Sequence, residues 1–238
     1  MALYIFSDAH LGAGPDAKEK IKTEKIAALF ELVKKDGDRL VILGDLFDFW
    51  FEYKHAMPKD QFEVLYRLYQ LKEFGIKIDY ISGNHDFWMD DFFQTQMGIE
   101  VHRDRLELEY AGKKLLLIHG DGISPSDKGY RVLKKVLRNR FNIWLYRKLP
   151  PDFAISLAKK VSGSSREITA RRDHEFALDY EKFAQEQLDN GHDVVAIGHL
   201  HLPVFKEFKE GVYINTGDFI NHFSYAKIVS DDVSLLYL

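Results

Sequence analysis

The sequence contains no cysteine in its 238 residues. A disulfide framework and a thiolate metal site are therefore excluded, and any transition metal must be held by nitrogen and oxygen ligands. No apolar run approaches the ~20 residues of a membrane-spanning helix, and the N-terminal stretch MALYIFSDAH lacks the basic segment of a secretion signal. These absences predict a cytoplasmic protein, with contact to the inner face of the cytoplasmic membrane left open.

Length and composition favour one large domain. A chain of 238 residues, 46% of them hydrophobic, is sufficient to bury a sizeable core. The sequence has no internal repeat, low-complexity tract or linker. We therefore expect residues 1–238 to form a single domain, with any second unit inserted within it.

Short runs rich in β-branched and aromatic residues are typical of strands. They occupy residues 3–8, 39–45, 77–84, 114–121, 193–201 and 211–218, and two further runs, SYAKIVS and VSLLYL, lie near the C-terminus. Helical periodicity separates the early strands at residues 21–35 and 61–74. This alternation predicts parallel βαβ units, antiparallel strands toward the C-terminus and an α/β (α+β) fold.

Residues 128–172 form a basic island. They carry 13 Lys or Arg against two acidic residues, a net +11, although the whole chain has a net charge of −4. Such a segment indicates an anionic partner such as nucleic acid, phosphate or an anionic lipid surface, although a solvated helix face is the ordinary alternative.

Apolar residues recur within the basic island at helical spacing. They predict one helix over residues 130–149 and, after Pro150 and Pro151, a second over residues 153–161. A basic amphipathic helix rich in aromatics either lies in a membrane interface or packs its apolar face on the main domain, and the pattern alone fits both.

Polar residues with metal-binding side chains stand where five of the predicted strands end. In an open α/β sheet such residues converge, because ligands bind outside the carboxyl ends of the strands. Grouping carboxylates and imidazoles without a cation would be costly, since buried charge must be paired or coordinated. We therefore predict a site for two divalent metals, with Mn²⁺ favoured, Fe²⁺ and Zn²⁺ also compatible, and Mg²⁺ disfavoured by the number of imidazoles. The candidate ligands are Asp8, His10, Asp45, Asn84, His119, His199 and His201.

The blocks SDAH, GDLFD, GNHD, IHGD and GHLH, in this order, resemble the calcineurin-like metallophosphoesterase family. The resemblance implies a β-sandwich flanked by helices. It also implies that Asp8, His10, Asp45 and His201 hold one metal and that Asp45, Asn84, His119 and His199 hold the other. In this family the histidine of GNH, here His85, donates a proton to the leaving oxygen and is oriented by the aspartate at position 48. Two metals would activate a water and clamp the phosphoryl oxygens.

The segments HGDGISPSDKGY and SREITARR are similar to those of the hydrolases that act on UDP-2,3-diacylglucosamine in lipid A biosynthesis. That resemblance implies a helical lid at residues 128–172 and a nucleotide-linked lipid substrate, cleaved at its pyrophosphate to UMP and 2,3-diacylglucosamine 1-phosphate. Ser162 or Ser164 could replace Ser165 in the alignment, and a polar loop is the ordinary alternative for all three. The implied substrate contacts are Asn84, His85, Asp127, Tyr130, Ser165, Thr169, Arg172 and His199.

The composition of the island agrees with a lipid. Acyl chains need apolar surface and phosphates need cations, and the island offers both, whereas a nuclease would need only the cations. Nucleic acid is therefore not expected as a partner. Nothing in the sequence specifies an oligomeric state.

Two positions depart from the best-known branch of those hydrolases. That branch has arginine where this chain has His85 and glutamate where it has Asp48. The departure leaves open another phosphomonoester or phosphodiester, such as a nucleotide, a phosphoprotein or nucleic acid. A non-catalytic metal-binding scaffold is disfavoured, because no predicted ligand position is degenerate.

Overall fold

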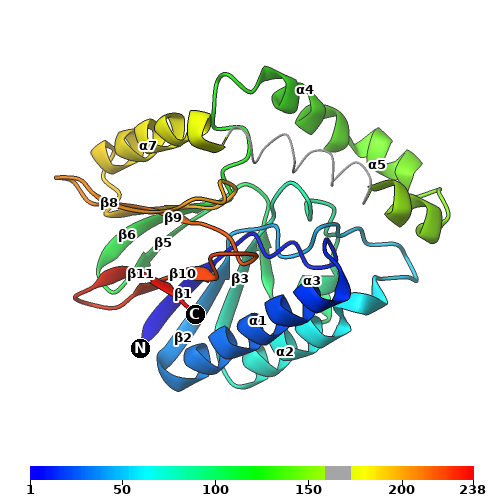
Figure 1. The fold of residues 1–238 in the computed structure, drawn as a ribbon, viewed down its shortest axis with the longest axis horizontal. Helices are drawn as coiled ribbons and strands as arrows, with labels where there is room; N and C mark the ends of the chain where they lie inside the picture. Colours follow the sequence, from blue (N-terminus) through cyan, green and yellow to red (C-terminus); the bar gives the residue numbers. More distant parts are fainter. Residues whose placement is uncertain (159–172) are drawn as a thin grey trace.

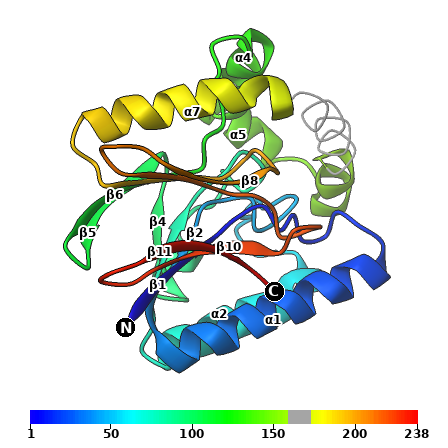
Figure 2. The same ribbon diagram turned by 60° about the vertical axis from the view of Figure 1, so that its left-hand side comes forward.

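Two β-sheets lie face to face between layers of helices in the computed structural model, which describes residues 1–158 and 173–238 (Figures 1 and 2). The first sheet has the strand order β11-β10-β1-β2-β3-β4, and the second has the order β5-β6-β7-β9-β8. The predicted sandwich flanked by helices is confirmed.

The first sheet is parallel from β1 to β4 and antiparallel at the edge formed by β10 and β11. In the second sheet β6, β7 and β9 are parallel, and β5 and β8 are antiparallel edge strands. The strands of the first sheet are β1 (Ala2–Phe6), β2 (Gly37–Ile42), β3 (Lys77–Ile81), β4 (Glu100–His102), β10 (Ser224–Ile228) and β11 (Val233–Tyr237). Those of the second are β5 (Arg105–Tyr110), β6 (Lys113–Ile118), β7 (Val194–Ile197), β8 (Pro203–Glu207) and β9 (Val212–Thr216).

Helices cover the outer face of each sheet (Figure 2). The helices α1 (Asp16–Asp36) and α2 (Phe62–Glu73) pack on the first sheet, and α7 (Asp173–Asp189) packs on the second. Two short elements, η1 (Lys59–Gln61) and α3 (Phe92–Thr95), lie in the connections around α2 and β3. The predicted helices at residues 21–35 and 61–74 correspond to α1 and α2.

Side-chain alternation explains why the strands are apolar on both faces. In β1, Leu3 and Ile5 join the core between the two sheets, whereas Tyr4 and Phe6 join the core under α1 and α2. Successive side chains of a strand point to opposite faces, so a strand buried on both sides reads as a continuous apolar run. This packing fixes the carboxyl ends of the parallel strands at one edge of the sandwich.

The basic island differs from its prediction. The single helix expected over residues 130–149 is wrong, because the chain forms two helices, α4 (Lys128–Leu137) and α5 (Arg140–Tyr146). Asn139 separates them, since its side chain accepts hydrogen bonds from the backbone N–H groups of Phe141 and Asn142 and thereby caps α5. Residues 151–158 are helical, as expected of the second helix, and the remainder of that prediction lies outside the described residues.

Among the described residues, no helix is both long and apolar enough to cross a membrane.

Candidate metal centre

The candidate ligands lie where parallel strands of both sheets end. Asp8 and His10 follow β1, Asp45 follows β2, and Asn84 follows β3. His119 comes directly after β6 in the second sheet, and the loop after β7 supplies two more histidines, His199 and His201. All seven predicted ligands are therefore on loops at the carboxyl ends of strands, as the sequence predicted.

Four of these residues have a left-handed backbone. The φ angles are 55° at Asp8, 42° at His10, 51° at Asp45 and 66° at His199, a region that residues other than glycine seldom adopt. Hydrogen bonds between loops hold two of them, since the Asp8 N–H donates to the Gly44 carbonyl at 3.1 Å and the His10 N–H to the Asp45 carbonyl at 2.9 Å. Strained backbone of this kind is concentrated at functional sites.

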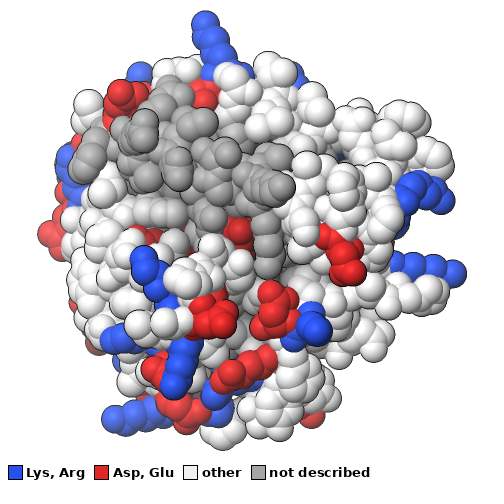
Figure 3. Space-filling view, turned by 45° about the vertical axis from the view of Figure 1, so that its right-hand side comes forward, with Lys and Arg blue, Asp and Glu red and all other residues white. Residues whose placement is uncertain are grey.

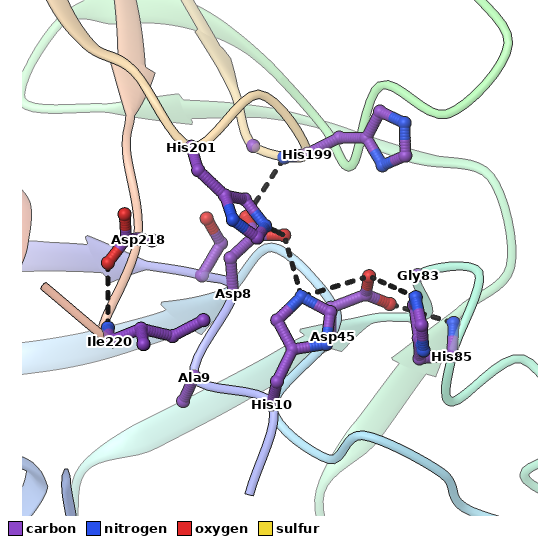
Figure 4. A network of polar contacts seen from close by, with 12 residues as sticks. Asp8, Ala9, His10, Asp45, Gly83, His85, His199, His201, Asp218 and Ile220 are labelled. Atoms are coloured by element: carbon purple, nitrogen blue, oxygen red, sulfur yellow. Dashed lines mark hydrogen bonds and ion pairs between the residues drawn. The ribbon is translucent and has the colours of Figure 1, made fainter. Parts of the chain in front are cut away.

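The side chains form two adjoining clusters around the carboxylates. Figure 4 shows the first, in which His10 and His201 lie beside Asp8, with Asp45 next to it. In the first, Asp8 Oδ1 lies 3.8 Å from His10 Nε2 and 3.6 Å from His201 Nε2. Asp45 lies between the clusters, because its Oδ2 is 3.7 Å from His10 Nε2 and 3.5 Å from His119 Nε2. The second cluster groups Asp45 and His119 with His199.

Asn84 joins the second cluster through its amide. His119 Nε2 lies 3.0 Å from Asn84 Oδ1, and the opposite ring nitrogen, Nδ1, lies 2.7 Å from the Leu43 carbonyl oxygen. Because a carbonyl only accepts, Nδ1 carries a proton, and Nε2 is the nitrogen that faces Asp45 and Asn84. A histidine that ligates through one nitrogen and donates from the other to a carbonyl is a common arrangement at metal sites.

Three buried atoms at this site make no hydrogen bond within the described part of the chain: Asp8 Oδ1 and both ring nitrogens of His10. Leaving such atoms unsatisfied is costly. The distances of 3.5–3.8 Å between these carboxylate oxygens and imidazole nitrogens are too long for hydrogen bonds. They suit atoms that share a cation, since two ligands each ~2.1 Å from one ion lie about 3 to 4 Å apart. The residues present therefore fit divalent metals.

Burial and charge set unusual protonation states. Burial lowers the pKa of His10 to about 4 and that of His199 to about 4, so both are neutral and suited to bind metal. Burial also acts to lower the pKa of His119, but the Asp45 carboxylate outweighs it and raises that pKa to about 10. Conversely, burial would raise the pKa of Asp45, but His119 and His85 hold it well below its usual range. A metal at this position would take the place of the His119 proton.

His85 is oriented toward the same carboxylates by the main chain. Its backbone N–H donates to Asp45 Oδ1 at 2.9 Å, and its Nδ1 lies 2.9 Å from the backbone carbonyl oxygen of Asp48. The Asp48 carboxylate is farther away, with Oδ1 3.7 Å from Nδ1 of both His85 and His10. His85 therefore presents Nε2 on the side of Asp45, 4.0 Å from Oδ2.

Asp86, which we did not select from the sequence, ties the metal loops together. It is fully buried and accepts hydrogen bonds from the Leu46 N–H at 3.0 Å, the Gly83 N–H at 2.7 Å and the Tyr80 hydroxyl at 2.5 Å. Burial and the nearby Asp45 carboxylate raise its pKa to about 6. The only sequence signal is that it follows His85 in the GNHD block.

A second unselected residue, Asp121, connects the site to α4. Its carboxylate accepts a hydrogen bond from the Tyr130 hydroxyl at 2.8 Å and pairs with Lys134 and Arg138. Two predicted substrate contacts lie here: Asp127 directly precedes α4, and the Tyr130 ring lies 6.2 Å from the His199 ring. The predicted contacts at Ser165, Thr169 and Arg172, with the alternatives Ser162 and Ser164, lie outside the described residues.

A cavity of about 430 Å³ adjoins the metal loops beneath α4 and α5. Asp48, Asn84 and His85 contribute to its wall, and most of the remaining lining is apolar. Those remaining residues are Phe49, Phe87, Trp88, Tyr130, Leu133, Lys134, Val136, Leu137, Arg138, Asn142, Ile143, Tyr146, Leu157 and Ala158.

Comparison with known proteins identifies the family through most of the chain. Residues 1–203 match the model of the family described as calcineurin-like phosphoesterase. A UDP-2,3-diacylglucosamine hydrolase of Porphyromonas gingivalis is 30% identical over 94% of this chain and 92% of its own length. Another protein of that name, from Pseudomonas fluorescens, is 27% identical over 88% of this chain and 82% of its own length.

Solved structures share the fold at lower identity. An archaeal phosphodiesterase aligns over 100% of both chains with a TM-score of 0.51 and 14% identity. The phosphoesterase Yfce of E. coli aligns over 100% of this chain and 93% of its own, with a TM-score of 0.52 and 20% identity.

Proposed function

The chain belongs to the calcineurin-like phosphoesterase family, a family of metal-dependent phosphoester hydrolases, and from that premise we propose that it hydrolyses the pyrophosphate of UDP-2,3-diacylglucosamine. The products would be UMP and 2,3-diacylglucosamine 1-phosphate, as part of lipid A biosynthesis. Residues 128–172 would form a lid over the lipid half of the substrate.

The observation that carries this proposal is the apolar cavity beside the metal loops. Asn84 and His85 line it together with Leu133, Val136 and Ile143 from α4 and α5. Ligand sites are mostly apolar clefts of ≈300–1,000 Å³ with a few convergent polar groups, and this cavity has that character. A phosphoester linked to acyl chains would place its phosphates at the polar groups and its chains along the apolar wall.

The outer surface of the same helices suits a membrane. Several large apolar side chains are exposed, including Val132 at 64%, Phe141 at 66% and Trp144 at 54%. Exposed cations accompany them on these helices, among them Arg131, Lys135 and Arg140. Figure 3 shows how Lys and Arg side chains are distributed over one face of the molecule. An apolar face bordered by cations binds an anionic lipid surface. This supports a peripheral position on the cytoplasmic membrane, from which a lipid substrate could be taken up.

The residues of the chain would divide the chemistry between them. Two divalent ions, proposed as Mn²⁺ with Fe²⁺ and Zn²⁺ as alternatives, would be held by the nitrogen and oxygen donors of Asp8, His10, Asp45, Asn84, His119, His199 and His201. Bound metals activate water and neutralise phosphoryl oxygens. Asp45, between the clusters, would be the shared ligand. His85, held at Nδ1 by the Asp48 carbonyl, would offer Nε2 to the leaving oxygen, and Asp48 would support its orientation.

Product analysis with the purified protein tests the proposal. We expect UMP release from UDP-2,3-diacylglucosamine with Mn²⁺, and none after chelation. The matched control is Asp45→Ala, which should be inactive although it folds. Failure of the active protein to release UMP above the chelated control would refute the assignment of this substrate.

His85 favours a second candidate, a phosphomonoester or phosphodiester with an alkoxide leaving group. Such a leaving group depends on a proton far more than a sugar phosphate does, because the second pKa of a phosphate is only about 6. A turnover of nucleotide or nucleic-acid phosphodiesters that exceeds that of the UDP-linked lipid would favour this candidate.

A further inference from the structure

Two cations line the cavity, Lys134 within α4 and Arg138 directly after its last residue, and neither belongs to the predicted metal or substrate residues. Lys134 and Arg138 are one helical turn apart and contribute to the same wall as Asn84 and His85. Lys134 is 26% exposed and Arg138 is 16% exposed. The other cations of α4 and α5 are exposed, so the partial burial of these two requires an explanation.

One buried carboxylate holds both cations. Asp121, whose side chain is 7% exposed, lies 2.7 Å from Lys134 Nζ and 3.0 Å from Arg138 Nη2. Lys134 Nζ also donates to the Asp121 backbone carbonyl at 2.8 Å. Arg138 also pairs with Asp104, whose carboxylate lies at 3.6 Å and is 83% exposed, so this ion pair contributes little.

Within residues 1–158 and 173–238, the two cations therefore carry one positive charge more than the buried carboxylate between them balances. Placing charge beside an apolar wall is costly unless an opposite charge pairs with it. The Phe87 ring adds orientation, because the Arg138 guanidinium lies 3.9 Å from its centroid and is thereby held along the cavity wall. A guanidinium fixed in this way presents a planar set of donors that matches a phosphate.

We propose that Lys134 and Arg138 form an anion-binding wall for the phosphate carried by the acylated half of the substrate, and that Asp121 is the positioning residue for both. The proposal rests on the function proposed above, in which the acyl chains lie in this cavity. The phosphate bonded to that half then lies beside the cavity wall, where the α4 cations complement the metal centre.

Octyl phosphate is a probe for the wall that does not depend on the identity of the natural substrate. Its binding to the metal-loaded protein would be measured by calorimetry and by inhibition of bis(p-nitrophenyl) phosphate hydrolysis, with neutral octyl glucoside as the comparison ligand. We expect Lys134→Met and Arg138→Met each to weaken octyl phosphate binding about tenfold or more, and to change octyl glucoside binding less than twofold.

Two kinds of control separate charge in the cavity from charge on the helix. Lys135→Met removes an exposed cation of α4 and should bind octyl phosphate like the unmodified protein. Lys134→Arg preserves the charge and should retain most of the binding. Unchanged thermal melting would show that the methionine variants fold.

The outcomes are distinct. Equal binding of octyl phosphate by the methionine variants and the unmodified protein would refute the proposed anion-binding wall. A loss of octyl phosphate affinity in Lys135→Met as large as in Lys134→Met or Arg138→Met would refute it too. If the expected pattern appears but UDP-2,3-diacylglucosamine yields no UMP, the wall stands and the proposed substrate is wrong.

Discussion

Replacement of His85 by alanine tests the proposed proton donor most directly. The imidazole is 8% exposed and its Nδ1 is fixed by the Asp48 carbonyl at 2.9 Å, so Nε2 has a defined direction toward the Asp45 carboxylate. General acid catalysis contributes ~10²–10⁴-fold, equivalent to about 3 to 5 kcal/mol of transition-state stabilisation. We expect His85→Ala to lose kcat by this range only where the leaving group requires a proton.

The assay is a series of aryl and alkyl phosphodiesters whose leaving groups increase in basicity. A nitrophenolate leaves unprotonated, so the kcat ratio between unmodified protein and variant should be a few-fold there and should rise to about 10²–10⁴ for alkoxides. Metal content is measured in parallel and should be unchanged. A kcat ratio that is the same across the series would refute proton donation, and loss of metal would make His85 a ligand instead.

Asp48→Asn is the matched control for orientation. It preserves the backbone carbonyl that holds Nδ1 and removes only the carboxylate charge 3.7 Å away. We therefore expect a smaller loss of kcat than in His85→Ala. A larger loss in Asp48→Asn would show that the carboxylate, not the main chain, sets the orientation of the ring.

Four further predictions follow from the contacts of the site. Asp45→Ala should lower bound metal from the proposed two ions to one or none, as read by elemental analysis, because its carboxylate lies between the two clusters. Asp86→Ala, which removes three buried hydrogen bonds, should lower the free energy of unfolding by about 3 to 5 kcal/mol in urea titration. Asp121 anchors α4 through Tyr130, and the Trp88 indole donates at 3.0 Å to the Leu137 carbonyl at the end of that helix. Asp121→Asn should therefore shift the emission of Trp88 to longer wavelength, and unchanged emission would contradict an anchoring role. After metal removal, stability should fall as the pH rises from about 6.5 to about 10, because the raised pKa of His119 favours the folded state only while the ring is protonated, and His119→Gln should flatten this dependence in thermal melts.

The strands that carry the site were predictable because burial on both faces makes them continuous apolar runs. The strands that were missed are weakly patterned edges. β5 (RLELEY) alternates apolar residues with charges, and β8 begins with Pro203, which is tolerated there because an edge strand has an unpaired side. β4 has only three residues. These segments become strands because they pair with a neighbouring strand, and the sequence of the segment alone does not reveal that partner.

Residues that would bind metal were easier to find than residues that position them. A ligand such as Asn84 stands directly after a strand, whereas the partners of Asp86 are a backbone N–H 40 positions away, a nearby glycine N–H and a tyrosine hydroxyl on β3. The partners of Asp121 likewise lie far along the chain, since Tyr130 and Arg138 are nine and 17 positions later. Such contacts are set by how loops pack and leave no periodic signal.

The two unselected aspartates suggest how the chain combines a rigid metal centre with a specific substrate wall. Asp86 binds backbone donors, which are the same whatever side chains surround them, and so fixes the loops that carry the ligands. Asp121 binds side chains of α4, which substitution alters readily. Changes in α4 could therefore alter which phosphoester is accepted while the metal loops keep their geometry. Replacement of Lys134 or Arg138 by methionine should consequently change the ratio of KM values for two substrates far more than it changes metal content.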